Sequence, residues 1–389
     1  MDSLQFRKMT PLLNKIQFNK PYVSDNEWNY LSQAVKGGQL GGDGQFTKKC
    51  HGWLESYLGC KKALLTHSCT GALEMSAILA GIEGGDEIIM PSFTFVSTAN
   101  AFVLRGGVPV FVDIRPDTMN MDENLIEAAI TTRTKAIVVV HYAGMACEMD
   151  TIMQIAKRNN LVVIEDAAQA IMSDYKGKKL GSIGHMATFS FHATKNLTSG
   201  EGGALIINEP AFAERAEVIW EKGTDRSKFL RGQVDKYSWV DLGSSCLPGE
   251  LTAAFLWAQL EKAEEIISKR LRIWQTYDDA FRALSNIGSL TLPAIPSDCK
   301  HNAHMYYLLL KDVQERHDFI QYMDEKFIST ATHYVPLHSS SFGKTCSRSH
   351  GKLQVTENIA QRLIRLPLWV GLEPYQEKVI EAVRLYIER

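Results

Sequence analysis

The stretch that decides the fold is 181–204, which reads GSIGHMATFSFHATKNLTSGEGGA. An apolar strand in it leads to Lys195, and a glycine-rich turn then enters a second apolar run. In a parallel sheet covered by helices, ligands collect beyond the carboxyl ends of the strands, which is where this lysine falls. Burial there lowers the pKa of a lysine, and only the neutral amine attacks an aldehyde. We therefore interpret Lys195 as a candidate Schiff-base residue, with a solvated surface charge as the alternative.

Seven short apolar runs recur along the first part of the chain, and each is continuous rather than alternating. Such runs are typical of strands that are buried on both faces. Helical patterns separate them, as at 122–130, where an acidic start precedes apolar residues three and four positions apart. The sequence therefore predicts an α/β fold with a seven-stranded, mainly parallel sheet. The runs are 63–65, 87–90, 109–112, 136–140, 161–164, 188–191 and 204–207.

The pattern changes at about Glu250, where a charged and apolar stretch without glycine or proline predicts one long helix over 250–281. A strand-like run follows at 304–310, and helical patterns follow near 314–326, 355–364 and 374–387. These elements predict a smaller C-terminal α+β domain. We expect two domains, residues 1–250 and 251–389.

Composition excludes several classes of protein. The chain has 389 residues with 42 basic and 44 acidic side chains, and this balance predicts no nucleic-acid partner. No apolar run reaches the 18 or so residues of a membrane span, and the N-terminus lacks the continuous apolar stretch of a signal peptide, so we expect a cytoplasmic protein. The seven cysteines contain no C-x-x-C pair, so neither a metal nor a redox site is predicted.

A carboxylate follows another buried strand, in the stretch LVVIEDAAQ at 161–169. Asp166 could cap the next helix, or it could hold the proton on a cofactor's pyridine nitrogen and make that ring an electron sink. Gln169 lies three residues later on the same helical face, where it could hydrogen-bond the ring hydroxyl. The sequence therefore places an acid and an amine where both can reach one pocket.

A phosphate site is predicted at LLTHSCTGAL, 64–73, where a strand runs through small residues into a helix. Small side chains let backbone N–H groups approach an anion, and the helix N-terminus favours negative charge. The hydroxyl of Ser190 could join the same site.

Together these motifs resemble the DegT/DnrJ/EryC1/StrS family of pyridoxal-phosphate (PLP)-dependent sugar aminotransferases, over about 16–385. The resemblance implies a PLP-dependent aminotransferase type I fold. Short stretches at 41–44, 141–144 and 231–237 are similar to the branch that aminates carbon 4 of dTDP-linked sugars. The motifs that carry the family resemblance are GDEIIMPSFTFVSTANA at 85–101, EDAAQ at 165–169, SFHATKN at 190–196, GEGG at 200–203 and HYVPLH at 333–338.

The resemblance also implies roles for single residues. Lys195 would join the cofactor aldehyde, Asp166 would pair with the pyridinium nitrogen, and Gln169 would contact the ring oxygen. Relatives use an asparagine in a G-x-N-Y-R motif to reach the partner subunit's cofactor phosphate, and the shorter Ser245 stands at that place in GSSCL, 243–247. The remaining assignments are Phe95 on the ring face, Thr70, Gly71 and Ser190 at the phosphate, His192 as a catalytic residue and His338 at the substrate. A core aromatic and two structural histidines are the alternatives for Phe95, His192 and His338.

The implied reaction is a transamination in two stages. L-glutamate leaves its amino group on the cofactor as pyridoxamine phosphate, which then aminates a keto-sugar nucleotide, dTDP-4-keto-6-deoxyglucose. The product, a dTDP-4-amino-4,6-dideoxyhexose, would enter a surface polysaccharide or antigen such as lipopolysaccharide or enterobacterial common antigen. A 3-keto sugar nucleotide as acceptor and a non-catalytic regulator with the same fold are the alternatives. Lys195 itself argues against the dehydrating branch, which carries histidine there.

Family members of this kind form homodimers with active sites at the interface. The resemblance therefore implies that the segment 231–245 reaches across to the partner. Arg231, Lys236 and Tyr237 in it are candidates for the nucleotide pyrophosphate, and a solvated loop is the alternative.

Overall fold

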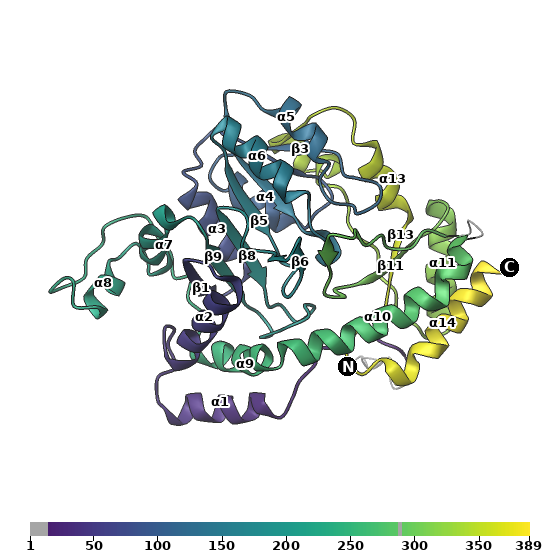
Figure 1. Cartoon of the computed structure of the whole chain (residues 1–389), viewed down its shortest axis with the longest axis horizontal. Coiled ribbons are helices and arrows are strands. Elements are labelled where there is room, and N and C mark those ends of the chain that lie inside the picture. Colours follow the sequence, from purple (N-terminus) through teal and green to yellow (C-terminus); the bar gives the residue numbers. More distant parts are fainter. Residues whose placement is uncertain (1–14, 287–289) are drawn as a thin grey trace, which may run out of the picture.

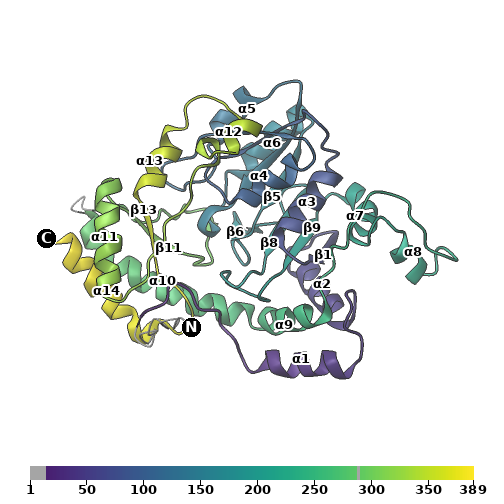
Figure 2. The ribbon, with the colours of Figure 1, turned by 180° about the vertical axis from the view of Figure 1, so that it is seen from behind.

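The computed structural model describes residues 15–286 and 290–389. The expectation that the first residues form no signal peptide lies largely outside this part of the chain. Figures 1 and 2 show a central sheet between two groups of helices, with α8 (Arg226–Leu230) on a segment that projects away from it. In the part of the chain that the structure describes, none of the helices combines the length and apolar character that crossing a bilayer requires.

The central sheet confirms the seven predicted strands and adds an eighth. Its order is β1-β9-β8-β5-β4-β2-β3-β12. Only β9 runs antiparallel to its neighbours, and all other pairs are parallel. The added strand, β12, has two residues and comes from the C-terminal part of the chain, where no apolar run predicts a strand. The bounds are β1 Lys62–Thr66, β2 Glu87–Pro91, β3 Val108–Val112, β4 Thr134–Val140, β5 Val162–Asp166, β8 Met186–Ser190, β9 Gly203–Ile207 and β12 Arg348–Ser349.

Helices cover both faces of this sheet, which explains why its strands are apolar without alternation. Residues of α2, α6 and α9 form one core with Ile89, Ile137 and Val163. Residues of α3, α4 and α7 form another with Ile88 and Val138 on the opposite face. The helical pattern at 122–130 becomes a 3₁₀ turn, Glu123–Leu125, followed by the short α5, Ile126–Ala129. The bounds are α1 Asn26–Lys36, α2 Gln45–Leu58, α3 Cys69–Leu79, α4 Val96–Val103, α6 Met149–Asn159, α7 Ala213–Trp220 and α9 Glu250–Glu261.

The prediction of one uninterrupted helix over 250–281 was wrong, because the helix breaks at Lys262. Helix α9 ends at Glu261 and α10 spans Ala263–Asn286. The N–H group of Lys262 bonds the carbonyl of Gln259 at 3.1 Å, a tightened 3₁₀ turn that needs neither glycine nor proline. The two helices pack into different cores: Leu256 of α9 into that of the large sheet, and Trp274 of α10 into a C-terminal one.

The C-terminal part pairs a two-stranded sheet with helices, as predicted, although its second strand was missed. The strand β11, Tyr306–Leu309, pairs antiparallel with β13, Leu363–Leu366. The helices are α11 Val313–Glu325, α12 Gly343–Cys346, α13 Gln354–Arg362 and α14 Glu373–Ile387. A small sheet joins the two parts of the chain: β6 Asp174–Tyr175 and β7 Lys178–Lys179 come from the first, and β10 Cys299–Lys300 comes from the second.

The division of the chain at residue 250 stays a prediction. Each of the two parts contributes a short segment to the core or sheet of the other. Ile16 packs into the C-terminal core, and β12 pairs with β3 of the large sheet.

Candidate active site

A cavity of about 460 Å³ opens beyond the carboxyl ends of the central strands. The last residues of β4, β5 and β8, which are Val140, Asp166 and Ser190, all line it. The loops after β1 and β2 close one side of the cavity, and residues around 304 and 365 close another. The cavity therefore lies where a sheet of this topology collects ligands.

Lys195 enters this cavity from the loop after β8. Its backbone N–H donates to the carbonyl of His192 at 2.9 Å, and the next residue, Asn196, is tied to the carbonyl of Asn302 at 2.8 Å. Burial lowers the pKa of the Lys195 amine, an effect that Cys69 and Asp166 oppose. The arrangement thus favours the neutral amine that attacks a carbonyl carbon.

Asp166 lies at the end of β5, in the same cavity. One carboxylate oxygen accepts a hydrogen bond from the Thr98 hydroxyl at 2.7 Å, and the other accepts one from the Ala168 N–H at 3.2 Å. Burial raises the pKa of Asp166, while the bond from Thr98 lowers it. A cationic ring N–H brought to this carboxylate would further stabilise its charged form.

Gln169 is fixed on both sides of its amide. Its Oε1 accepts from the N–H of Ala143 at 2.7 Å, and its Nε2 donates to the hydroxyl of Tyr334 at 2.9 Å. The second N–H of Nε2 is left to serve a ligand oxygen.

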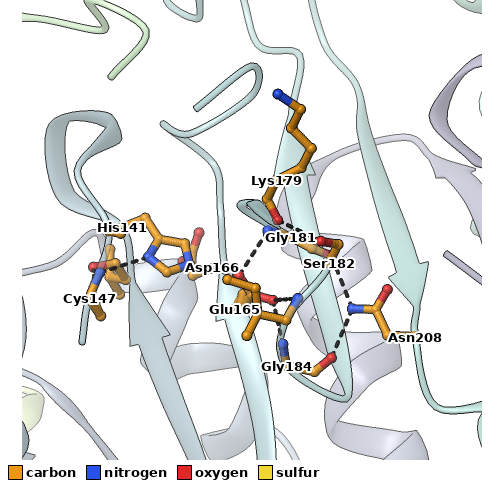
Figure 3. Close-up of polar contacts among 12 residues, drawn as sticks. His141, Cys147, Glu165, Asp166, Lys179, Gly181, Ser182, Gly184 and Asn208 are labelled. Atoms are coloured by element: carbon orange, nitrogen blue, oxygen red, sulfur yellow. Dashed lines mark hydrogen bonds and ion pairs between the residues drawn. The ribbon is translucent and has the colours of Figure 1, made fainter. Parts of the chain in front are cut away.

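Glu165, the neighbour of Asp166 in β5, holds the turn that contains Gly181 and Gly184 (Figure 3), and sequence reasoning missed this role. The buried carboxylate accepts from the N–H groups of Gly181 and Gly184 at 2.8 and 2.6 Å and from His141 Nε2 at 2.9 Å. Because His141 Nδ1 accepts from the Cys147 N–H at 3.2 Å, the proton of that ring lies on Nε2. Burial raises the pKa of Glu165, but these donors outweigh it and hold the pKa below its usual value. The network fixes the turn that precedes β8 against β5.

The N-terminus of α3 forms a cradle for an anion. The first N–H groups of an α-helix have no intrahelical partner, and Ser68 satisfies one of them by accepting from the Gly71 N–H at 3.1 Å. Thr70 bonds Ser97 at 2.8 Å beside it. Gly203 of β9 lies so close that an added Cβ would be 2.4 Å from the backbone nitrogen of Cys69. Small residues and a helix terminus therefore shape a site that suits a phosphate.

The structure brings most predicted cofactor residues together. Lys195, Asp166, Gln169, Phe95, Thr70, Ser190 and His192 all line the cavity. Gly71 lies in the first turn of α3. His192 Nδ1 bonds Thr194 at 2.9 Å, and its Nε2 faces Glu201 at 3.5 Å. An amine, an acid, an amide and a phosphate cradle in one cavity fit PLP.

Five other predicted residues lie outside this cavity within the single chain. Ser245 and Tyr237 line a second hollow of about 370 Å³, Arg231 pairs with Glu217 at 2.9 Å, and Lys236 is exposed. His338 bonds the Ser92 hydroxyl at 2.7 Å and faces Glu357 at 3.3 Å. Their roles stay predictions.

Several cavity residues were not anticipated. His333 and Tyr334 line it, although the motif that contains them drew attention to His338. Thr98 was hidden in the motif at 85–101. Arg365 is the clearest omission, since a charged residue within the apolar run LIRLPL at 363–368 was a visible signal.

Comparison with known proteins agrees with this geometry. The model of the DegT/DnrJ/EryC1/StrS aminotransferase family matches residues 21–384. GDP-perosamine synthase of Caulobacter vibrioides is 34% identical over 328 residues, which cover 84% of this chain and 86% of that protein. The aminotransferase TlmJ of Streptoalloteichus hindustanus has a TM-score of 0.88 at 28% identity, covering 96% of this chain and 99% of its own. PseC of Helicobacter pylori, an aminotransferase of pseudoaminic acid biosynthesis, has a TM-score of 0.87 at 26% identity, covering 96% of this chain and all (100%) of its own. The chain therefore belongs to the DegT/DnrJ/EryC1/StrS aminotransferase family and is a PLP-dependent aminotransferase related to enzymes that act on sugars.

Proposed function

We propose that this enzyme transfers the amino group of L-glutamate to a nucleotide-linked keto-6-deoxysugar, dTDP-4-keto-6-deoxyglucose, and yields a dTDP-4-amino-4,6-dideoxyhexose. The observation that carries the proposal is the meeting of Lys195, Asp166 and the α3 cradle in one cavity. The names of GDP-perosamine synthase and PseC support a sugar as acceptor. The stretches at 41–44, 141–144 and 231–237, which are similar to those of dTDP-4-amino-4,6-dideoxygalactose transaminase, support carbon 4 and dTDP.

Lys195 is the residue that would move the proton. PLP, when bound, supplies the ring that accepts the electron pair of the broken C–H bond. The amine of Lys195, whose pKa burial lowers, would take the proton from the donor's α-carbon and deliver it to the C4′ carbon of the bound cofactor. Running the same step in reverse on the keto sugar requires no second base. A single positioned amine therefore serves both halves of the reaction.

The other cavity residues hold the ring in place. Asp166, with its bond from Thr98, would keep the proton on the ring nitrogen. Gln169 would orient the ring oxygen, and Phe95 at the edge of the cavity would cover one ring face. The first turn of α3 and the Ser190 hydroxyl would hold the phosphate.

A homodimer with shared active sites is part of the proposal. Exposed apolar residues gather on the projecting segment around α8, where Trp239 is 82% exposed and Val240 is 53% exposed. Phe95 is 59% exposed although it lines the cavity. If a partner subunit covers these surfaces, four residues of one chain would reach the active site of the other: Arg231, Lys236, Tyr237 and Ser245. His338 remains a candidate for binding the substrate.

Cytoplasmic location and a role in surface polysaccharide or antigen synthesis complete the proposal. The seven cysteines of the described chain are all free thiols, which supports a reducing compartment.

The test is to incubate the enzyme with PLP, glutamate and either dTDP-4-keto-6-deoxyglucose or a 3-keto isomer, and to identify products by NMR. We expect a 4-amino product from the first compound alone. A 3-amino product would support the alternative acceptor. Lys195→Ala should lose both turnover and the visible absorbance of the lysine-bound cofactor, whereas Lys179→Ala, outside the cavity, should keep both. A Lys195→Ala protein that retained turnover would contradict the assignment.

A further inference from the structure

His304 lines the active-site cavity together with Lys195, and the proposed reaction gives it no role. It follows β10, on a segment that the buried Arg270 of α10 holds in place. Arg270 Nε donates to the carbonyl of Ala303 at 3.1 Å, and its Nη2 donates to the carbonyl of His304 at 2.9 Å. The imidazole of His304 therefore meets the cavity from a fixed backbone.

The hydrogen bonds of His304 identify which ring nitrogen carries the proton. Its Nδ1 lies 2.9 Å from Asn196 Oδ1. The oxygen of that amide faces the ring because the amide nitrogen, Nδ2, donates to the carbonyl of Asn302 at 2.8 Å. An amide oxygen only accepts hydrogen bonds, so Nδ1 is the donor. In the neutral imidazole, Nε2 is then an acceptor with a lone pair.

The surroundings of His304 keep its ring neutral. Burial holds the pKa of His304 well below its usual value, and Lys195, Arg270, Arg365 and His333 lower it further. Among residues 15–286 and 290–389, the hydrogen bonds of this side chain are confined to Nδ1. The cavity therefore contains a neutral nitrogen acceptor, Nε2, whose partner is missing.

One lysine and one arginine line the cavity with His304. The guanidinium of Arg365 is held by the Thr332 carbonyl at 3.2 Å and by the Phe18 ring, whose centre lies 4.8 Å from its Cζ. The amine of Lys195 makes no hydrogen bond or ion pair in the part of the chain that the structure describes. It ends a flexible four-carbon side chain. Lys195 is therefore the cation that is free to reach Nε2.

We propose that His304 is a positioning residue for Lys195, and that its Nε2 accepts a hydrogen bond from the amine whenever the amine is not joined to the cofactor. The bond stabilises the ammonium form, which exists after the amine has taken a proton. The proton stays on Lys195, because the ring of His304 remains neutral. This inference rests on the proposed role of Lys195 and names the group that holds its amine during the proton transfer.

The experiment measures the pKa of Lys195 in full-length protein without cofactor. Competitive acetylation with acetic anhydride over a range of pH, followed by mass spectrometry of the peptide that carries Lys195, gives this pKa. His304→Leu removes both ring nitrogens at similar volume. Because the ammonium then loses its acceptor, the pKa of Lys195 should fall by about one to two units. His304→Gln places an amide oxygen near the position of Nε2 and should recover part of this fall.

His301→Leu is the matched control for these variants. His301 lies on the same segment but outside the cavity, where its ring packs edge-on against Trp274 with the centroids 4.5 Å apart. This substitution should leave the pKa of Lys195 unchanged. If His304→Leu does not fold, His304→Asn replaces it, because an asparagine keeps a donor toward Asn196, lacks Nε2 and should show the same fall. An unchanged pKa in the variant of His304, or an equal fall in His301→Leu, would overturn the inference.

Glutamate deuterated at its α-carbon adds a second readout on the PLP-loaded enzyme. Because misplacing a reacting group slows its step, conversion of the lysine-bound cofactor should fall about 10- to 100-fold in His304→Leu. The glutamate concentration at half-maximal rate should stay constant, and the isotope effect should be at least as large as in the wild type. Weaker dTDP binding with an unchanged conversion rate would assign His304 to the sugar nucleotide and overturn the inference. Failure of the proposed function would instead appear in the wild type, whose cofactor absorbance glutamate would not change.

Discussion

The bond from Thr98 to Asp166 should control how well the enzyme keeps its cofactor ring charged. The Thr98 hydroxyl donates to Asp166 at 2.7 Å and pairs with the Thr94 hydroxyl at 2.8 Å, and both threonines are buried. Thr98→Val removes the hydroxyl and keeps the shape. A hydrogen bond to a charged group contributes about 1.5–3 kcal/mol, so turnover and cofactor affinity at neutral pH should each fall about 10- to 100-fold.

The direction of the pH effect follows from the structure. The bond lowers the pKa of Asp166 against the larger effect of burial, so its loss raises that pKa further. The carboxylate then becomes protonated at higher pH, and the acidic limb of the rate profile moves toward neutral pH. Steady-state rates measured from pH 5 to 9 test this shift.

Thr94→Val is the matched control for this prediction. It removes the outer hydroxyl and leaves the bond between Thr98 and Asp166 in place, so its rate profile should stay close to that of the wild type. An unshifted acidic limb in Thr98→Val, or an equal shift in Thr94→Val, would refute the reasoning.

Three other substitutions test contacts that hold the sheet and its site together. Glu165→Gln should lower the free energy of unfolding by about 2–4 kcal/mol in urea titrations at pH 7, because an amide NH₂ would face backbone N–H donors; an unchanged midpoint would contradict the network. Glu87, whose pKa falls to about 2 chiefly through Arg348, against the effect of burial, stabilises the fold above its unfolded pKa and loses this contribution as pH falls toward 2. Glu87→Gln should therefore be less stable than the wild type at pH 7, with the gap closing between about pH 5 and pH 2; a gap independent of pH would count against the ion pair. Gly203→Ala should prevent cofactor binding, since its Cβ would be 2.4 Å from the Cys69 nitrogen, and equilibrium dialysis with PLP that gave wild-type affinity would disprove the close contact.

Sequence alone predicted the elements that hydrophobic pattern determines. The seven buried strands were recognisable because short continuous apolar runs are typical of strands that are buried on both faces. The break at Lys262 could not be recognised in the sequence, because the 3₁₀ turn there depends on which core each half of the helix packs against. The strand β12 is two residues long and carries no pattern of its own.

The candidate site was predictable where a residue's role follows from its place after a strand. Lys195 and Asp166 could be found in this way. Thr98 could not, since its importance depends on a neighbour 68 positions away, Asp166. Arg365 carried a visible signal, a charge within an apolar run, but its contact with Phe18 of the N-terminal segment could not be foreseen. His333 was passed over for His338 because the two share one motif and only folding separates them.

The strand β12 covers the edge of the central sheet and so limits its pairing with other copies of this protein. Arg348 and Ser349 occupy the outer edge of β3 beside Val110 and Phe111, and Arg348 is clamped to Glu87 at 2.7 Å. An uncovered strand margin invites stacking with other molecules. Loss of β12 by proteolytic cleavage would thus leave the backbone groups of β3 open to pairing with a second molecule, even with the catalytic groups intact.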